Sequence, residues 1–113
     1  MERQLLAAGV PEFQRELKFL DNRRFRADFG WGSPHMLILE VEGGIWTGGR
    51  HTSGVGFQND CEKYSLAGLA GYTVLRCTGK HIKDGSAIQW VTKYFEDARN
   101  AGNVAGETGS ENN

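Results

Sequence analysis

Apolar and polar residues alternate along positions 24–31, where the chain reads RFRADFGW. A period of two is typical of a β-strand that buries one of its faces. The next three residues, GSP, favour a turn. Positions 36–41 follow and are strongly apolar, as expected of a central strand that is covered on both faces. The pattern therefore predicts two strands joined by a tight turn.

Three carboxylates fall at one end of this predicted strand pair. Glu40 and Glu42 are two residues apart, so their side chains project to the same side of a strand. Antiparallel pairing across the turn can bring Asp28 beside them. Like charges at close range repel, so such a cluster calls for a cation, and hard oxygen ligands suit Mg²⁺ or Mn²⁺. In the alternative interpretation, Glu40 and Glu42 lie past the strand end in solvent and pair with nearby arginines.

The remaining pattern predicts an α/β fold with one mixed sheet flanked by helices. The strands up to Glu42 are expected to form an antiparallel meander. Roughly 30 residues separate Glu42 from the next strand, a length that matches a right-handed β-α-β crossover and makes that strand parallel to its neighbour. The expected elements are a helix at 2–8, strands at 16–20, 23–31 and 36–41, a helix at 57–70, a strand at 72–77 and a helix at 86–99.

Apolar residues recur at helical spacing in both longer helices, so each is expected to bury an apolar stripe. The stripe of the last helix is Ile88, Val91, Phe95 and Ala98. The buried side of the middle helix is expected to consist of Phe57, Cys61, Tyr64, Leu66, Leu69 and Ala70.

Length and composition indicate one domain. The 113 residues, 39% hydrophobic and 24% charged, are compatible with an ordinary soluble globule with a single core. Residues 1–99 carry the regular patterns, whereas residues 100–113 have almost nothing to bury and are expected to form a disordered tail. No apolar run approaches the roughly 20 residues of a membrane span, and no signal peptide is evident. A cytoplasmic protein without membrane contact is therefore expected.

The charge distribution permits a nucleic-acid partner without demanding one. The formal net charge is −1, but all 13 lysines and arginines precede Asn100. The predicted domain is therefore slightly positive, and it becomes clearly positive if a metal neutralises the three carboxylates.

A glycine-rich segment, GGIWTGGRHTSGVG, follows Glu42. Segments of this composition are often plain linkers. Trp46, Arg50 and His51, in a loop that leaves the carboxylate end of a sheet, favour a binding loop instead. His51 is either an exposed bystander or a contact to a phosphate or a water molecule.

The first turns of the middle helix carry Lys63, a basic side chain that is a further candidate for the carboxylate site. A helix that packs over the strand bearing Glu40 and Glu42 can direct Lys63 towards their carboxylates. The alternative is a solvated lysine that pairs with Asp60 on its own helix.

At this point the chain resembles the PD-(D/E)XK nuclease superfamily, in particular its small single-domain members related to very short patch repair endonucleases and to small phage endonucleases. The resemblance covers residues 2–95 and rests on the segments RFRADFGW, LILEVEGG, GGRHTSG, DCEKY and GYTVLR. It implies a restriction-endonuclease-like core. It also implies Mg²⁺-dependent hydrolysis of DNA, with Asp28 and Glu40 as the metal ligands.

The sequence departs from the pattern of that superfamily at two positions. A lysine normally stands two residues after the metal-binding glutamate, where this chain has Glu42, and Ala27 replaces the usual proline. Some members move the catalytic lysine to the following helix, a role that Lys63 would fill. Several members also carry a helical glutamine followed by a tyrosine four residues later, which Asp60 and Tyr64 resemble.

These observations together predict an endonuclease that uses Mg²⁺ or Mn²⁺ to hydrolyse DNA. Asp28, Glu40 and Glu42 would hold metal, while Lys63 and His51 would act at the scissile phosphate. Two other functions stay open: a DNA-binding module of the same fold without cleavage, and a Ca²⁺-stabilised structural protein. Cutting of both strands would favour a homodimer. The residues expected to contact DNA are Arg24, Arg26, Arg50, Lys80 and Lys83 at its backbone and Trp46 at a base.

Overall fold

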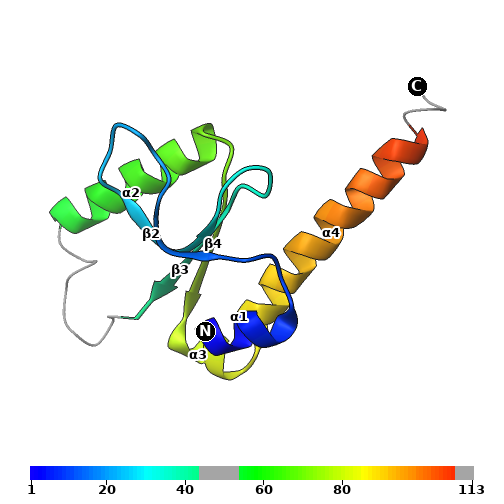
Figure 1. Cartoon of the computed structure of the whole chain (residues 1–113). Coiled ribbons are helices and arrows are strands. Elements are labelled where there is room, and N and C mark those ends of the chain that lie inside the picture. The colour runs from blue at the N-terminus through cyan, green and yellow to red at the C-terminus, as the bar shows by residue number, and fades with distance from the viewer. Residues whose placement is uncertain (44–53, 109–113) are drawn as a thin grey trace.

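The computed structural model describes residues 1–43 and 54–108. They form a four-stranded sheet with helices on both faces (Figure 1). The predicted α/β class with a flanked, mixed sheet is therefore confirmed. In chain order, the elements are α1 (Glu2–Ala8), β1 (Gln14–Lys18), β2 (Arg26–Trp31), β3 (Leu37–Glu42), α2 (Gly54–Leu69), β4 (Thr73–Thr78), α3 (Gly79–Lys83) and α4 (Ser86–Thr108).

The sheet has the predicted strand order and directions. β1, β2 and β3 form an antiparallel meander, and β4 pairs with β3 in parallel after the crossover through α2. Helix α2 covers one face, while α1 and α4 cover the other (Figure 1). Strand ends differ from the expected ones by a few residues, and α3 has no counterpart in the predicted set.

Two hydrophobic clusters divide between the two faces of the sheet. On the α1 and α4 face, Trp31 and Leu39 pack with Leu5 of α1 and Val91 of α4. On the α2 face, Ile38 packs with Ala67. Consecutive residues of β3 therefore bury their side chains on opposite faces, as the apolar run predicted.

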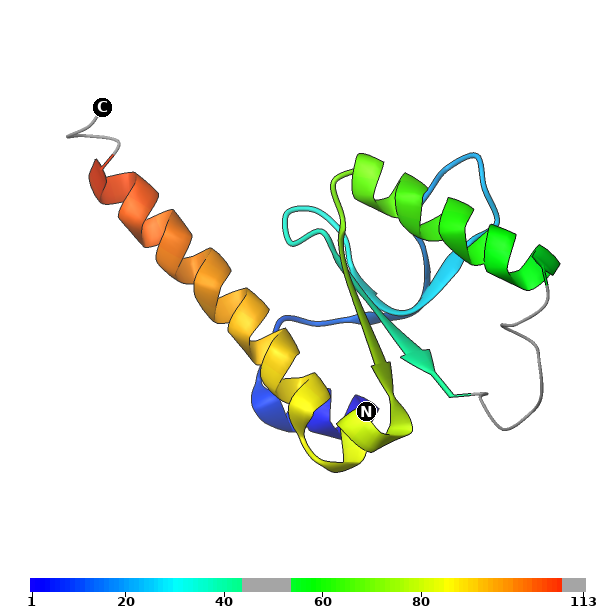
Figure 2. The same ribbon diagram turned by 180° about the vertical axis from the view of Figure 1, so that it is seen from behind.

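Helix α4 is longer than expected and leaves the body of the molecule. The predicted stripe is observed for Ile88, Val91 and Phe95, whereas Ala98 is exposed. The helix continues past the predicted end at Arg99 to Thr108, projecting from the sheet (Figure 2). The predicted disordered tail at 100–113 therefore overlaps the last part of this helix, and its disorder stays a prediction.

The predicted buried face of α2 is correct only in part. Tyr64 is partly buried, as predicted, whereas Phe57 and Leu69 are 62% and 84% exposed, and Cys61 is also exposed. The inward side also carries Lys63, which is partly buried. The sheet face beneath this part of α2 carries carboxylates, and buried charges require polar partners more than apolar cover.

Gly30 marks a close approach between β1 and β2, where the side chain of Leu17 lies over its backbone. A Cβ atom at position 30 would lie 2.3 Å from Leu17 Cδ2 and 2.8 Å from Leu17 Cβ. Gly30→Ala should therefore lower the free energy of unfolding by about 1–3 kcal/mol, the usual effect of overpacking. Urea denaturation measures this loss. Gly32→Ala is the control, because a Cβ there meets nothing within 4 Å. Equal stabilities of the two variants would contradict the packing argument.

Candidate active site

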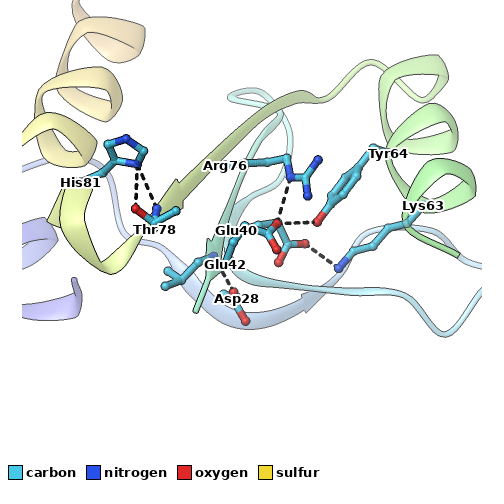
Figure 3. A network of polar contacts seen from close by, with 9 residues as sticks. Asp28, Glu40, Glu42, Lys63, Tyr64, Arg76, Thr78 and His81 are labelled. Atoms are coloured by element: carbon cyan, nitrogen blue, oxygen red, sulfur yellow. Dashed lines mark hydrogen bonds and ion pairs between the residues drawn. The ribbon is translucent and has the colours of Figure 1, made fainter. Parts of the chain in front are cut away.

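A row of charged residues crosses three strands on the face that α2 covers (Figure 3). Glu40 on β3 lies directly opposite Arg76 on β4 in the parallel ladder. Asp28 on β2 lies next to the pair Phe29–Leu39, at the end of the antiparallel ladder. There the Asp28 carboxylate accepts a hydrogen bond of 2.7 Å from the backbone N–H of Val41. Asp28 is thereby fixed at the end of the ladder between the two strands.

Glu40 is the buried centre of this row, with its side chain only 7% exposed. The Nζ atom of Lys63 descends from α2 to 2.6 Å from Glu40 Oε2. Burial raises the pKa of the Glu40 carboxyl from 4.5 to about 7; the negative charge of Asp28 adds to this rise, and Lys63 opposes it. Because burial disfavours the ionised form of Glu40, a further positive charge nearby would stabilise its carboxylate.

Glu42 belongs to a second, more exposed cluster. Its Oε2 atom accepts a hydrogen bond of 3.1 Å from the hydroxyl of Tyr64 and pairs with Arg76 Nε at 2.9 Å. The guanidinium of Arg76 also lies over the Tyr64 ring, 4.5 Å from its centroid. Helix α2 thus supplies one neighbour to each glutamate, Lys63 to Glu40 and Tyr64 to Glu42.

Tyr64 is held as a neutral hydrogen-bond donor. Burial raises the pKa of its hydroxyl well above the usual value, and the charges of Glu40 and Glu42 raise it further. The phenol therefore keeps its proton at neutral pH. It can orient a carboxylate or a phosphate oxygen, but it cannot serve as a general base.

The structure brings two of the three predicted carboxylates together. Asp28 lies close enough to raise the pKa of Glu40, whereas the Glu42 carboxylate is engaged by Tyr64 and Arg76. Within residues 1–43 and 54–108, no group of three His, Cys, Asp or Glu side chains is placed to hold a metal ion. The expected convergence of three carboxylates is therefore not observed.

The chemistry of Asp28 and Glu40 still fits a small divalent cation. Mg²⁺ keeps several water ligands and is commonly bound by only one or two carboxylates together with substrate phosphates. The ionised side chains Asp28, Glu40, Glu42, Lys63 and Arg76 comprise three negative and two positive charges, so the cluster has an excess negative charge. Such a donor set suits Mg²⁺ or Mn²⁺ better than it suits a softer metal.

The other predicted site residues lie outside this row or outside the described residues. Trp46, Arg50 and His51 lie outside the described residues. The remaining basic candidates are all exposed, on the segment leading into β2, on β2 itself and on α3; they are Arg24, Arg26, Lys80 and Lys83.

Arg76 is the site residue that the sequence interpretation missed. The signal for it was present, because β4 runs parallel to β3 and a residue of β4 must lie opposite Glu40. The strand ends were known only approximately from the sequence, and a shift of one residue moves a side chain to the other face. The register of the parallel ladder was therefore needed to place Arg76 in the site.

No protein-family model matches the chain, and comparisons with curated proteins and with solved structures find no significant match. None of the helices among the described residues is both long enough and apolar enough to span a membrane. The proposed function therefore rests on the side chains that lie between the sheet and α2.

Proposed function

We propose that this chain is a Mg²⁺-dependent endonuclease that hydrolyses DNA phosphodiester bonds. The observation that carries the proposal is the arrangement around Glu40. Asp28 and Glu40 lie on neighbouring strands, Glu40 is buried with a raised pKa, and Lys63 contacts it at 2.6 Å. Two carboxylates could hold a divalent cation that activates water and polarises a phosphoryl oxygen, and a basic side chain beside them could stabilise developing phosphate charge.

The order of the elements supports the same assignment. A helix, a three-stranded meander, a helix and a parallel strand are the restriction-endonuclease-like order that the sequence resemblance implied. The position of Lys63 also supports the proposal, because Lys63 approaches Glu40 from α2 while Glu42 occupies the strand position at which that superfamily usually has lysine. In this proposal, Lys63 is the catalytic lysine moved to the helix.

Asp28, Glu40 and Lys63 then each have a defined role. Hydrolysis joins a water oxygen to phosphorus and breaks one P–O bond, and negative charge grows on the phosphoryl oxygens. Asp28 and Glu40 would hold the cation, which lowers the pKa of the attacking water and polarises the phosphoryl oxygen when bound. The Lys63 ammonium would stabilise the developing phosphate charge. Helix α2 limits access of bulk water to the Glu40 side, which strengthens these electrostatic interactions.

The surrounding positive residues would bind the DNA backbone. Arg24, Arg26, Lys80 and Lys83 are exposed and free to reach phosphates at a distance from the scissile bond. Arg50, His51 and Trp46 belong to the segment that connects β3 with α2. In this proposal, the segment contributes a backbone contact, a contact to the scissile phosphate and a stacking side chain.

Cleavage of supercoiled plasmid tests the function directly. The wild-type protein should nick the plasmid in Mg²⁺ or Mn²⁺ and should have no activity in EDTA. Plasmid that is shifted in a gel but never cut would identify a DNA-binding module without catalysis. Undiminished cutting in EDTA would refute the metal mechanism.

Lys63→Met should lower the turnover rate by roughly 10- to 1,000-fold, the range for loss of one preorganised charged group. Methionine is unbranched and nearly as long as lysine but carries no charge. Single-turnover cleavage with enzyme in excess measures the chemical step. Lys93→Met is the control, because Lys93 also pairs with a carboxylate, at 3.1 Å from Asp97, but lies exposed on α4. Wild-type rates in Lys63→Met would show that the helix lysine has no part in catalysis.

A further inference from the structure

The guanidinium of Arg76 lies in the candidate site but has no part in the chemistry described above. We propose that Arg76 is a substrate-binding residue that grips a non-bridging oxygen of the scissile phosphate, exchanging its contact with Glu42 for that phosphate. This inference rests on the proposed nuclease function and adds to it the residue that holds the reacting group.

The position of Arg76 in the sheet supports this role. Arg76 lies directly opposite Glu40 in the β3–β4 ladder, and both side chains rise on the face that α2 covers (Figure 3). A phosphate bound at the Asp28 and Glu40 end of the row would therefore have a guanidinium on the next strand. Neighbouring parallel strands lie about 4.8 Å apart, which is within reach of an arginine side chain.

Exposure distinguishes Arg76 from the other cation of the site. The Lys63 side chain is only 16% exposed and is committed to Glu40. The Arg76 side chain is 48% exposed. Arg76 can therefore meet a ligand that arrives from solvent before Lys63 can.

The contacts of Arg76 orient it without using up its donors. Glu42 engages the Nε atom, and the ring of Tyr64 supports the plane of the guanidinium. Arginine carries five N–H donors, and its terminal nitrogens suit bidentate binding of a phosphate. A guanidinium held flat in this way loses less conformational freedom when the phosphate binds than a free side chain does.

Structural stabilisation alone is a weak explanation of the Arg76–Glu42 pair. Ion pairs with this exposure contribute little to the stability of a fold. The exchange for a phosphate also leaves no carboxylate without a partner, because the Tyr64 hydroxyl still donates to Glu42. In the free protein, the contact with Glu42 thus keeps the Arg76 guanidinium in position.

The experiment measures single-turnover cleavage of a short labelled duplex in Mg²⁺ at increasing enzyme concentration and several salt concentrations. Arg76→Met should raise the half-saturating enzyme concentration at least about 10-fold and should reduce the slope of log affinity against log salt by about 1, as expected for one lost phosphate contact. Arg76→Lys should restore the salt slope but only part of the affinity, because an ammonium lacks the bidentate fork.

Arg23→Met is the matched control. Arg23 also pairs with a glutamate, Glu62, at 2.6 Å, is 42% exposed and lies over an aromatic ring, that of Phe25, but it has no place in the row. Its half-saturating concentration should change less than about twofold. An Arg76→Met variant that binds and cuts like Arg23→Met overturns the inference for Arg76 while leaving the nuclease function in place.

Glu42→Gln should act in the opposite direction to Arg76→Met, which a folding defect would not do. The glutamine side-chain oxygen can still accept the Nε–H bond that orients Arg76, while the negative charge that competes with the phosphate is removed. The half-saturating concentration should therefore equal the wild-type value or lie below it. A higher value for Glu42→Gln overturns the exchange. A wild-type protein that neither binds nor cuts DNA refutes the proposed function itself, and the role of Arg76 with it.

Discussion

Replacing Glu40 with glutamine should lower the rate of Mg²⁺-dependent DNA cleavage by roughly 100- to 1,000-fold or more, because the substitution removes the buried charge that would hold the cation. Glutamine has nearly the same shape, and its carbonyl oxygen can still accept a hydrogen bond from Lys63. The fold should therefore survive. Single-turnover cleavage of plasmid, with the far-ultraviolet circular dichroism spectrum as the check on folding, measures the effect.

Glu62→Gln is the control for this prediction. Glu62 is a glutamate of α2 whose exposed side chain pairs with Arg23, so its neutralisation should leave cleavage unchanged. The double variant Glu40→Gln, Lys63→Met should cut little more slowly than Glu40→Gln alone, since residues that act as a unit lose their effects non-additively. Wild-type activity in Glu40→Gln would remove Glu40 from the mechanism.

The sheet could be predicted from the sequence because its apolar pattern is local. The alternation that ends at Trp31 and the apolar segment before Glu40 predicted two strands, although Ala27 packs in the cluster under α2 and Phe29 in the cluster on the other face. The length of the crossover then fixed β4 as parallel to β3. These features depend on spacing along the chain, which the sequence displays directly.

The inward face of α2 could be predicted only in part, because a polar site changes the usual rule. Apolar periodicity placed Phe57 and Leu69 inward together with Tyr64, but Phe57 and Leu69 are exposed, and Tyr64 faces the sheet beside Lys63. Electrostatic partners of the carboxylates decided the orientation. A helix with a weak apolar pattern next to a cluster of acidic residues is therefore a signal of a site rather than of a poor core.

The contacts that Glu42 makes are with residues far from it in the sequence. The period of a strand correctly placed Glu40 and Glu42 on one side. Its actual neighbours, Tyr64 and Arg76, come from the next helix and the next strand. Their reach depends on the register of β4 and the rotation of α2, which no local pattern specifies.

The stability of the metal-free protein should fall as the pH rises from about 5 to 8, because of Glu40. Its pKa is about 7 in the folded protein, against 4.5 for an ordinary glutamate. The folded state therefore binds the proton more tightly than the unfolded chain. The stabilisation from this source is complete below pH 4.5 and is lost as the pH rises through 7. The loss amounts to at most about 3 kcal/mol in the free energy of unfolding.

Urea denaturation in EDTA between pH 4.5 and 8.5 measures this loss, and Glu40→Gln isolates it. The variant has no proton to lose at this position, so the difference in stability between variant and wild type should grow with pH. Adding Mg²⁺ at pH 8 should restore stability to the wild type by about 2.7 kcal/mol at 100 times the dissociation constant and should leave the variant nearly unchanged. If the free energies of unfolding of the two proteins change in parallel with pH, folding does not raise the pKa of Glu40. A Mg²⁺ response of equal size in both would place the cation elsewhere.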